Sequence, residues 1–94
     1  MKFHVEIIRD QENHMWYIEN SDVPGLTSWN YHYNDLLDDL SALVPRLLRD
    51  NQIDTSNDKF VELETTTHCD RSDLGWTKTI RTIQIPLDKR CNGA

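Results

Sequence analysis

Seven aliphatic residues between positions 36 and 48 constrain the fold of this chain more than any other feature of its sequence. They are separated by steps of one, three, three, one, three and one residues, and they are Leu36, Leu37, Leu40, Leu43, Val44, Leu47 and Leu48. This spacing keeps all seven on one face of an α-helix, whereas a strand would distribute them over both of its faces. We therefore predict an amphipathic helix that packs one side on a hydrophobic core.

Polar residues mark both ends of this helix. Asn34 is a good N-cap, and Asp35 places negative charge in the first turn, where the helix dipole favours it. Pro45 removes one backbone hydrogen bond, but it lies seven residues after Asp38 and therefore on the polar side of the helix. We expect one bent helix and not two separate ones. Asn51 can adopt the left-handed conformation that ends a helix.

Alternating apolar residues predict strands before and after the helix. The predicted strands are 3–8, 14–19, 26–29, 59–67 and 79–87, with a polar turn at 10–13 and a loop at 68–75. The first two strands form a hairpin, and the short third strand returns along the second. The sequence therefore predicts an α+β fold of the order β-β-β-α-β(-β), in which an antiparallel sheet of three to five strands carries one long helix on one face.

The length of 94 residues is enough for one domain with a single core. We assign residues 1–87 to this domain and expect 88–94 to be a flexible tail. No apolar run approaches the roughly 20 residues needed to span a membrane, and the N-terminus lacks the apolar core of a secretory signal. A cytoplasmic location is therefore expected. Cys69 and Cys91 lie in no paired motif, and we expect reduced thiols in preference to a disulfide between them.

Acidic residues outnumber basic ones by 16 to 10, which gives a net charge of −6. This excess argues against unaided binding to nucleic acid, because such binding depends on neutralising phosphates. It favours a basic protein partner, which would be attracted by charge. The same net charge would also be sufficient to keep a small protein soluble.

The sequence from Asp22 to Leu26 predicts a type II turn. Pro24 fixes φ near −65° and Gly25 can take a positive φ, which is the residue order of that turn. The side chain of Asp22 can accept hydrogen bonds from nearby backbone amides. The turn therefore joins the second strand to the segment before the helix in a defined geometry.

Three tryptophans are a high number for so short a chain: Trp16, Trp29 and Trp76. We expect Trp16 to lie in the core. Trp29 and Trp76 either cap sheet edges or serve as partly exposed anchors for a protein partner, where indoles concentrate.

Residues with catalytic chemistry form no convincing constellation. The histidines are His4, His14, His32 and His68, none of which has a partner at ligand spacing on a helix, and we expect them to lie on the surface. A zinc site from 68–70 and Cys91 would lack a second close pair of ligands. The carboxylates of Glu6, Glu62 and Glu64 lie on two predicted strands and could hold magnesium for hydrolysis. All three lie opposite the apolar face, however, where solvated charges are expected. We predict no catalytic residue, metal or cofactor.

Three features in their order resemble the short, single-domain branch of the HicB-like antitoxin family. They are an aromatic strand residue at Trp16, the turn Asp22-x-Pro24-Gly25-Leu26, and a helix carrying Val44-Pro45-x-Leu47-Leu48. The resemblance covers residues 3–67. It implies a partial RNase H-like fold that lacks the acidic nuclease site. Two departures from the family are Trp29-Asn30 after the turn and a C-terminal region, 68–94, without a DNA-binding helix.

The resemblance also implies a function. Such a protein would be an antitoxin that binds and occludes a small basic HicA-type ribonuclease, and would form a homodimer or higher homo-oligomer, for example through a sheet edge. We assign partner binding to Asp22, Pro24, Gly25, Trp29 and Trp76. Two alternatives remain open: a self-associating module that has no toxin, and a divalent-metal-dependent hydrolase that uses the three strand glutamates.

Overall fold

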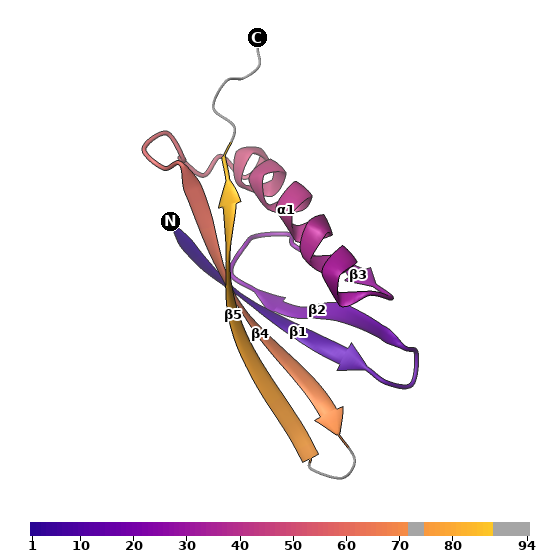
Figure 1. Cartoon of the computed structure of the whole chain (residues 1–94). Helices are drawn as coiled ribbons and strands as arrows, with labels where there is room; N and C mark the ends of the chain where they lie inside the picture. Colours follow the sequence, from indigo (N-terminus) through magenta and orange to yellow (C-terminus); the bar gives the residue numbers. More distant parts are fainter. Residues whose placement is uncertain (72–74, 88–94) are drawn as a thin grey trace.

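One helix lies across one face of a five-stranded sheet (Figure 1). The computed structural model describes the backbone of residues 1–71 and 75–87, and the side chains of these residues except at 70–77. The elements are β1 (Lys2–Asp10), β2 (Met15–Ser21), β3 (Trp29–Asn30), α1 (Tyr33–Asp50), β4 (Phe60–Arg71) and β5 (Gly75–Pro86). The α+β class and the single helix are as the sequence predicts. No helix in the described residues is long and apolar enough to cross a membrane.

The sheet is mixed, which corrects the prediction of a wholly antiparallel one. Its strand order is β3-β2-β1-β4-β5, and the central pair, β1 with β4, is parallel. The other three pairs are antiparallel. Parallel neighbours need a long crossover connection. Here α1 carries the chain back to the end of the sheet at which β1 begins, so β4 runs in the same direction as β1 (Figure 1).

The last two strands are longer than predicted. β4 and β5 pair continuously from Phe60 opposite Pro86 to Arg71 opposite Gly75, so most of the predicted loop at 68–75 is strand. This pairing involves many threonines, whose branched side chains suit a pleated surface but do not alternate as apolar residues do. In contrast, β3 has only two residues, and the Ser28 carbonyl before it accepts a bond of 3.0 Å from the amide of Ile18.

The helix ends differ from the predicted caps. His32, with extended backbone, is the N-cap residue, and its carbonyl accepts the amide of Leu36 at 3.0 Å. Asn34 therefore lies inside the first turn. At the other end Asn51 has a φ of −94°, and it is Gln52 that takes the left-handed φ of 58°. The Asn51 side chain instead donates to the carbonyl of Leu47 at 2.8 Å, which satisfies a terminal helix carbonyl.

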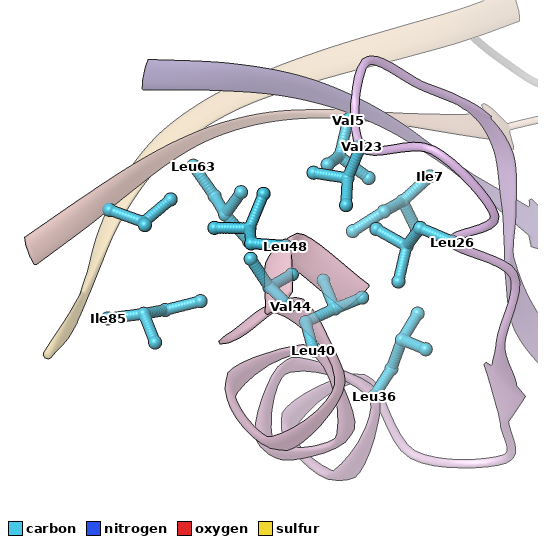
Figure 2. Close-up of a cluster of buried hydrophobic side chains, with 11 residues drawn as sticks. Val5, Ile7, Val23, Leu26, Leu36, Leu40, Val44, Leu48, Leu63 and Ile85 are labelled. Carbon is cyan, nitrogen blue, oxygen red and sulfur yellow. The ribbon is translucent and has the colours of Figure 1, made fainter. Parts of the chain in front are cut away.

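The core lies between α1 and the sheet (Figure 2). Four helix residues of the predicted stripe are fully buried in it: Leu36, Leu40, Val44 and Leu48. The strands contribute Val5, Ile7, Val61, Leu63 and Ile85, and the segment after β2 contributes Val23 and Leu26. Burial of each such side chain contributes about 1.5–3 kcal/mol. Pro45 is accommodated within α1, as the sequence predicts.

Candidate interaction surface

The strands present a second set of residues on the face opposite the helix, which we call the open face. Side chains alternate along a strand, and residues opposite each other on neighbouring strands share a face. The register therefore aligns one residue from every strand in a single row across the open face. This open-face row consists of Trp29, Tyr17, Ile8, His68 and Lys78, from β3, β2, β1, β4 and β5.

One end of the open-face row is aromatic and exposed. Trp29 is 52% exposed, and its ring lies edge-on to that of Tyr31 with 5.2 Å between centroids. Tyr17 and Ile8, the next two members of the row, are half-buried. Burial raises the pKa of Tyr17 above its usual value, and the carboxylates of Glu19 and Asp10 raise it further. Tyr17 is thus partly desolvated, although no other element covers this face among the described residues.

Carboxylates also occupy the open face. Glu6 lies two residues before Ile8 on β1, and Glu62 and Glu64 lie on β4. These three residues thus lie on the face on which the sequence places them. Lys2 partly offsets them, because its Nζ atom is 3.8 Å from Oε2 of Glu64. The apolar part of the row, Trp29, Tyr17 and Ile8, thus shares the open face with these carboxylates, of which Glu6 is the nearest along the strands.

The predicted turn is present, and its contacts lie within the chain. Gly25 has a φ of 78°, and the Leu26 amide donates to the Val23 carbonyl at 3.2 Å, as in a type II turn. Asp22 bonds to the backbone of His4 twice: its Oδ2 accepts the His4 amide at 3.0 Å, and its own amide donates to the His4 carbonyl at 2.9 Å. These two hydrogen bonds therefore connect the start of the turn to β1.

The five residues assigned to partner binding do not form one cluster. Pro24 accepts a bond of 3.4 Å from the Asn51 side chain, which places the turn beside the C-terminal end of α1. Trp29 lies near the other end, because its neighbour Asn30 donates to the Asp39 side chain at 3.2 Å. From residue 39 to residue 51 a helix rises roughly 18 Å. The backbone of Trp76 lies in β5 opposite Asp70, and its side chain is outside the described part of the chain.

The histidines are mostly where the sequence places them. His14 lies in the turn between β1 and β2 and His32 before α1, and both are exposed. His4 is half-buried, and its Nε2 atom lies 2.8 Å from Oγ1 of Thr66. Within the described residues, no three His, Cys, Asp or Glu side chains are grouped so that they could hold a metal ion. Cys91 lies outside those residues, so the expectation that Cys69 and Cys91 are reduced thiols stays a prediction.

Other aromatic residues stabilise the helix side of the sheet. Trp16 packs against the core with its ring centroid 5.0 Å from that of Tyr33, as expected for a core tryptophan. The Arg9 guanidinium lies 5.1 Å from the Trp16 ring centroid, a cation–π contact.

A cavity of about 440 Å³ lies at the other end of α1, beside Pro45, Arg49 and Leu87. It contains none of the assigned partner-binding residues.

Sequence reasoning did not identify Tyr17 and Ile8 as candidate site residues. The alternation of the strands could have identified them, because each is an apolar residue next to a core position and therefore points to the opposite face of the sheet. Without the strand order, however, neither could be placed beside Trp29. The fold and this face define a single-helix α+β domain with one packed and one open sheet face.

Comparisons with known proteins agree with this description. A family model for a domain of unknown function, DUF1902, matches residues 2–72, and the chain belongs to this family. The crystal structure of a hypothetical protein from the extremely thermophilic bacterium Thermus thermophilus is similar, with 31% sequence identity and a TM-score of 0.61. That similarity covers 71% of this chain and 92% of the other. No match was found among curated proteins.

Proposed function

We propose that this chain is a non-catalytic, antitoxin-like protein that binds and covers a small basic ribonuclease of the HicA type. Two lines of support are independent of each other. The hairpin, the Asp22-x-Pro24-Gly25 turn and the leucine-rich helix resemble HicB-like antitoxins, and the DUF1902 family is related to HicB-like proteins. The second line is the chemistry of the open face.

The observation that carries the proposal is the exposed aromatic end of the open-face row. Trp29 is more than half exposed and lies opposite Tyr17, which in turn lies opposite Ile8 on the next strand. Tryptophan and tyrosine dominate binding energy at protein interfaces because they bury much apolar area with little loss of rotamer entropy. The row crosses four strand spacings and is therefore roughly 19 Å long. A standard interface of about 800 Å² per partner would extend from the row over Glu6.

The negative charge of the open face favours a basic protein as the partner. A ribonuclease must attract phosphates and is therefore basic where it contacts RNA. Carboxylates on the open face and a net charge of −6 would steer such a surface toward this protein. A basic surface bound here would be unavailable to RNA, so steric cover is sufficient for inhibition and no catalytic group is required.

The turn has a different part in this proposal. Asp22, Pro24 and Gly25 hold the segment before β3 in place through the bonds to His4 and Asn51. Trp29 follows four residues after Gly25, so the turn positions the aromatic end of the row. We therefore assign direct contact to Trp29 and a positioning role to the three turn residues.

The proposal predicts that a small basic protein is encoded next to this chain, and the test uses that protein. We expect its expression alone to stop growth and co-expression of this chain to restore growth. Trp29→Ala should weaken the purified complex by at least roughly 30-fold, as expected for an interface hot spot. Glu6→Gln and Asp38→Asn form a matched pair, because each removes one negative charge and only Glu6 lies on the open face.

Glu6→Gln should slow association and reduce its salt dependence, whereas Asp38→Asn should change both less. If no basic toxic protein is encoded nearby, and the chain recovers only itself from cells, the self-associating module is the better description. Magnesium-dependent RNA cleavage that is lost in Glu62→Gln would instead establish the hydrolase.

A further inference from the structure

The two edges of the sheet are very different. At one edge β3 has two residues, and at the other β5 has twelve, from Gly75 to Pro86 (Figure 1). Among the described residues no strand pairs with the outer side of β5. A long edge strand with unpaired backbone groups is a template for pairing with another chain. The family model ends at residue 72, so β5 lies outside the part of the chain that it matches.

The register determines which backbone groups of β5 face outward. The Leu87 amide donates to the Lys59 carbonyl at 2.9 Å, directly after the pair Phe60–Pro86. In an antiparallel ladder, pairs that exchange hydrogen bonds alternate with pairs that do not. The odd-numbered residues of β5 therefore direct their amides and carbonyls toward β4. Lys78, Ile80 and Thr82 direct theirs outward, toward the free edge.

We propose that β5 pairs antiparallel with β5 of a second copy, around a two-fold axis that passes through the Ile80 pair. The two sheets would then form one continuous sheet of ten strands. Because the two-fold axis of an antiparallel ladder is perpendicular to the sheet, both helices would lie on one side and both open faces on the other. This proposal does not depend on the proposed function.

The side chains of β5 favour this axis over the one through Arg81. Ile80 is 58% exposed and would be covered by Ile80 of the second copy. Lys78 would lie opposite Thr82 and Arg81 opposite Thr79, so no like charges would face each other directly. An axis through Arg81 would instead place the two arginines against each other, which is unfavourable.

Charge also supports a second copy as the occupant of this edge. The segment 75–86 contains two cations and no carboxylate, although the chain as a whole carries −6. On the open face, Thr82 has Glu64 as its neighbour on β4. Lys78 of one copy would thus lie two strand spacings, roughly 10 Å, from Glu64 of the other, within reach of two long side chains. The two-fold axis creates this pair twice.

The opposite edge explains why such pairing would stop at two copies. Head-to-tail growth would require β5 of one copy to pair with β3 of the next, and β3 offers only two residues. Pairing of β5 with itself is isologous and closes on forming a dimer. A dimer is therefore the expected assembly of this edge.

The experiment measures the mass of the full chain in solution by sedimentation velocity, from about 1 μM to about 1 mM. We expect a dimer whose dissociation constant rises at least roughly 10-fold in Ile80→Lys, because two ammonium groups would meet at the axis. The control is Trp29→Lys, which adds the same charge at an exposed apolar position of the opposite edge and should leave the dimer intact. Circular dichroism checks that both variants fold.

Reversing the charges of Lys78 and Glu64 gives a second test, whose expected result could not be produced by unfolding of a variant. Lys78→Glu and Glu64→Lys should each weaken the dimer by roughly 2- to 30-fold, and the double variant should restore it, because the pair is intermolecular. A chain that remains monomeric at all these concentrations would overturn the proposal. So would a dimer that Ile80→Lys leaves intact, or one that Trp29→Lys weakens equally. The dimer test uses no toxin, so its failure would leave the proposed function standing.

Discussion

The two faces of the sheet are built from the same strands, but one packs against α1 and the other stays open. On the helix side Val5, Ile7 and Leu63 are fully buried beneath α1. On the open face their immediate neighbours include Glu6 and Ile8, which remain accessible. The faces differ although their residues alternate within the same stretches of sequence. Position in the alternation, and not hydrophobicity alone, therefore decides which residues stabilise the fold.

The comparison also separates two kinds of apolar residue. Apolar residues on the helix side meet partners from several elements, so they contribute to stability. On the open face, Trp29 and Phe60 are about half exposed and have no covering element within the described part of the chain. Exposed aromatic residues of this kind mark interaction sites when they form a group. Mutations on the two faces should therefore have different consequences.

The largest effect should come from the centre of the packed face. Leu40→Ala removes a fully buried side chain and should lower the free energy of unfolding by about 2–5 kcal/mol. Phe60→Ala removes a larger side chain from the open face and should lower it by less than about 1.5 kcal/mol, because Phe60 is 49% exposed. Urea denaturation followed by circular dichroism measures both. Equal losses would mean that the open face is covered in solution.

An intermediate effect is expected at the turn, which belongs to the packed side. Gly25 has a positive φ, but a Cβ atom there would lie 3.6 Å from Cδ2 of Leu47, an ordinary contact. Gly25→Ala should therefore destabilise the fold by about 1–2 kcal/mol through backbone strain alone. Gly25→Asn is the matched control, since asparagine tolerates this conformation better, and it should cost less. A larger loss for asparagine than for alanine would indicate a steric cause.

Local patterns predicted the elements that depend on near neighbours. The leucine spacing identified the helix, although its N-cap lies two residues before the predicted one. The Pro24-Gly25 order identified the turn. Both follow from interactions within a few residues. The cap at His32 was missed because its side chain makes no capping bond. Only the geometry of the preceding segment reveals it.

Pairing between distant segments could not be predicted in the same way. The parallel contact of β1 with β4 depends on where the helix returns the chain, and alternation alone does not give direction. Thr65, Thr66 and Thr67 are all buried, so polarity did not mark where β4 continues. For the same reason Trp29 was identified as a candidate site residue, whereas Tyr17 and Ile8 were not. The members of the open-face row could not be grouped from the sequence, because their grouping depends on the order of the strands in the sheet.

The smallest effect tests whether the open-face row is continuous. The pKa of Tyr17 is raised mainly by burial and further by Glu19 and Asp10. Trp29→Ala should lower this pKa toward its usual value, because the cross-strand neighbour of Tyr17 would be lost and the phenol would be better solvated. Glu19→Gln should lower it less, and Glu12→Gln, in the exposed turn of the hairpin, should leave it unchanged. The measurement is the pH dependence of the Cζ chemical shift in protein labelled with ¹³C-tyrosine.

The same shift has a defined consequence for stability. A raised pKa means that folding favours the neutral phenol, so this contribution is complete below the unfolded-state pKa near 10 and is lost as the pH rises through the folded-state pKa. The free energy of unfolding should therefore decline less between pH 9 and pH 11 in Trp29→Ala than in the parent chain. An unchanged pKa of Tyr17 in Trp29→Ala would show that the indole does not cover the phenol. The row would then be a set of separate side chains, and the interface proposed for it would lose its continuous aromatic end.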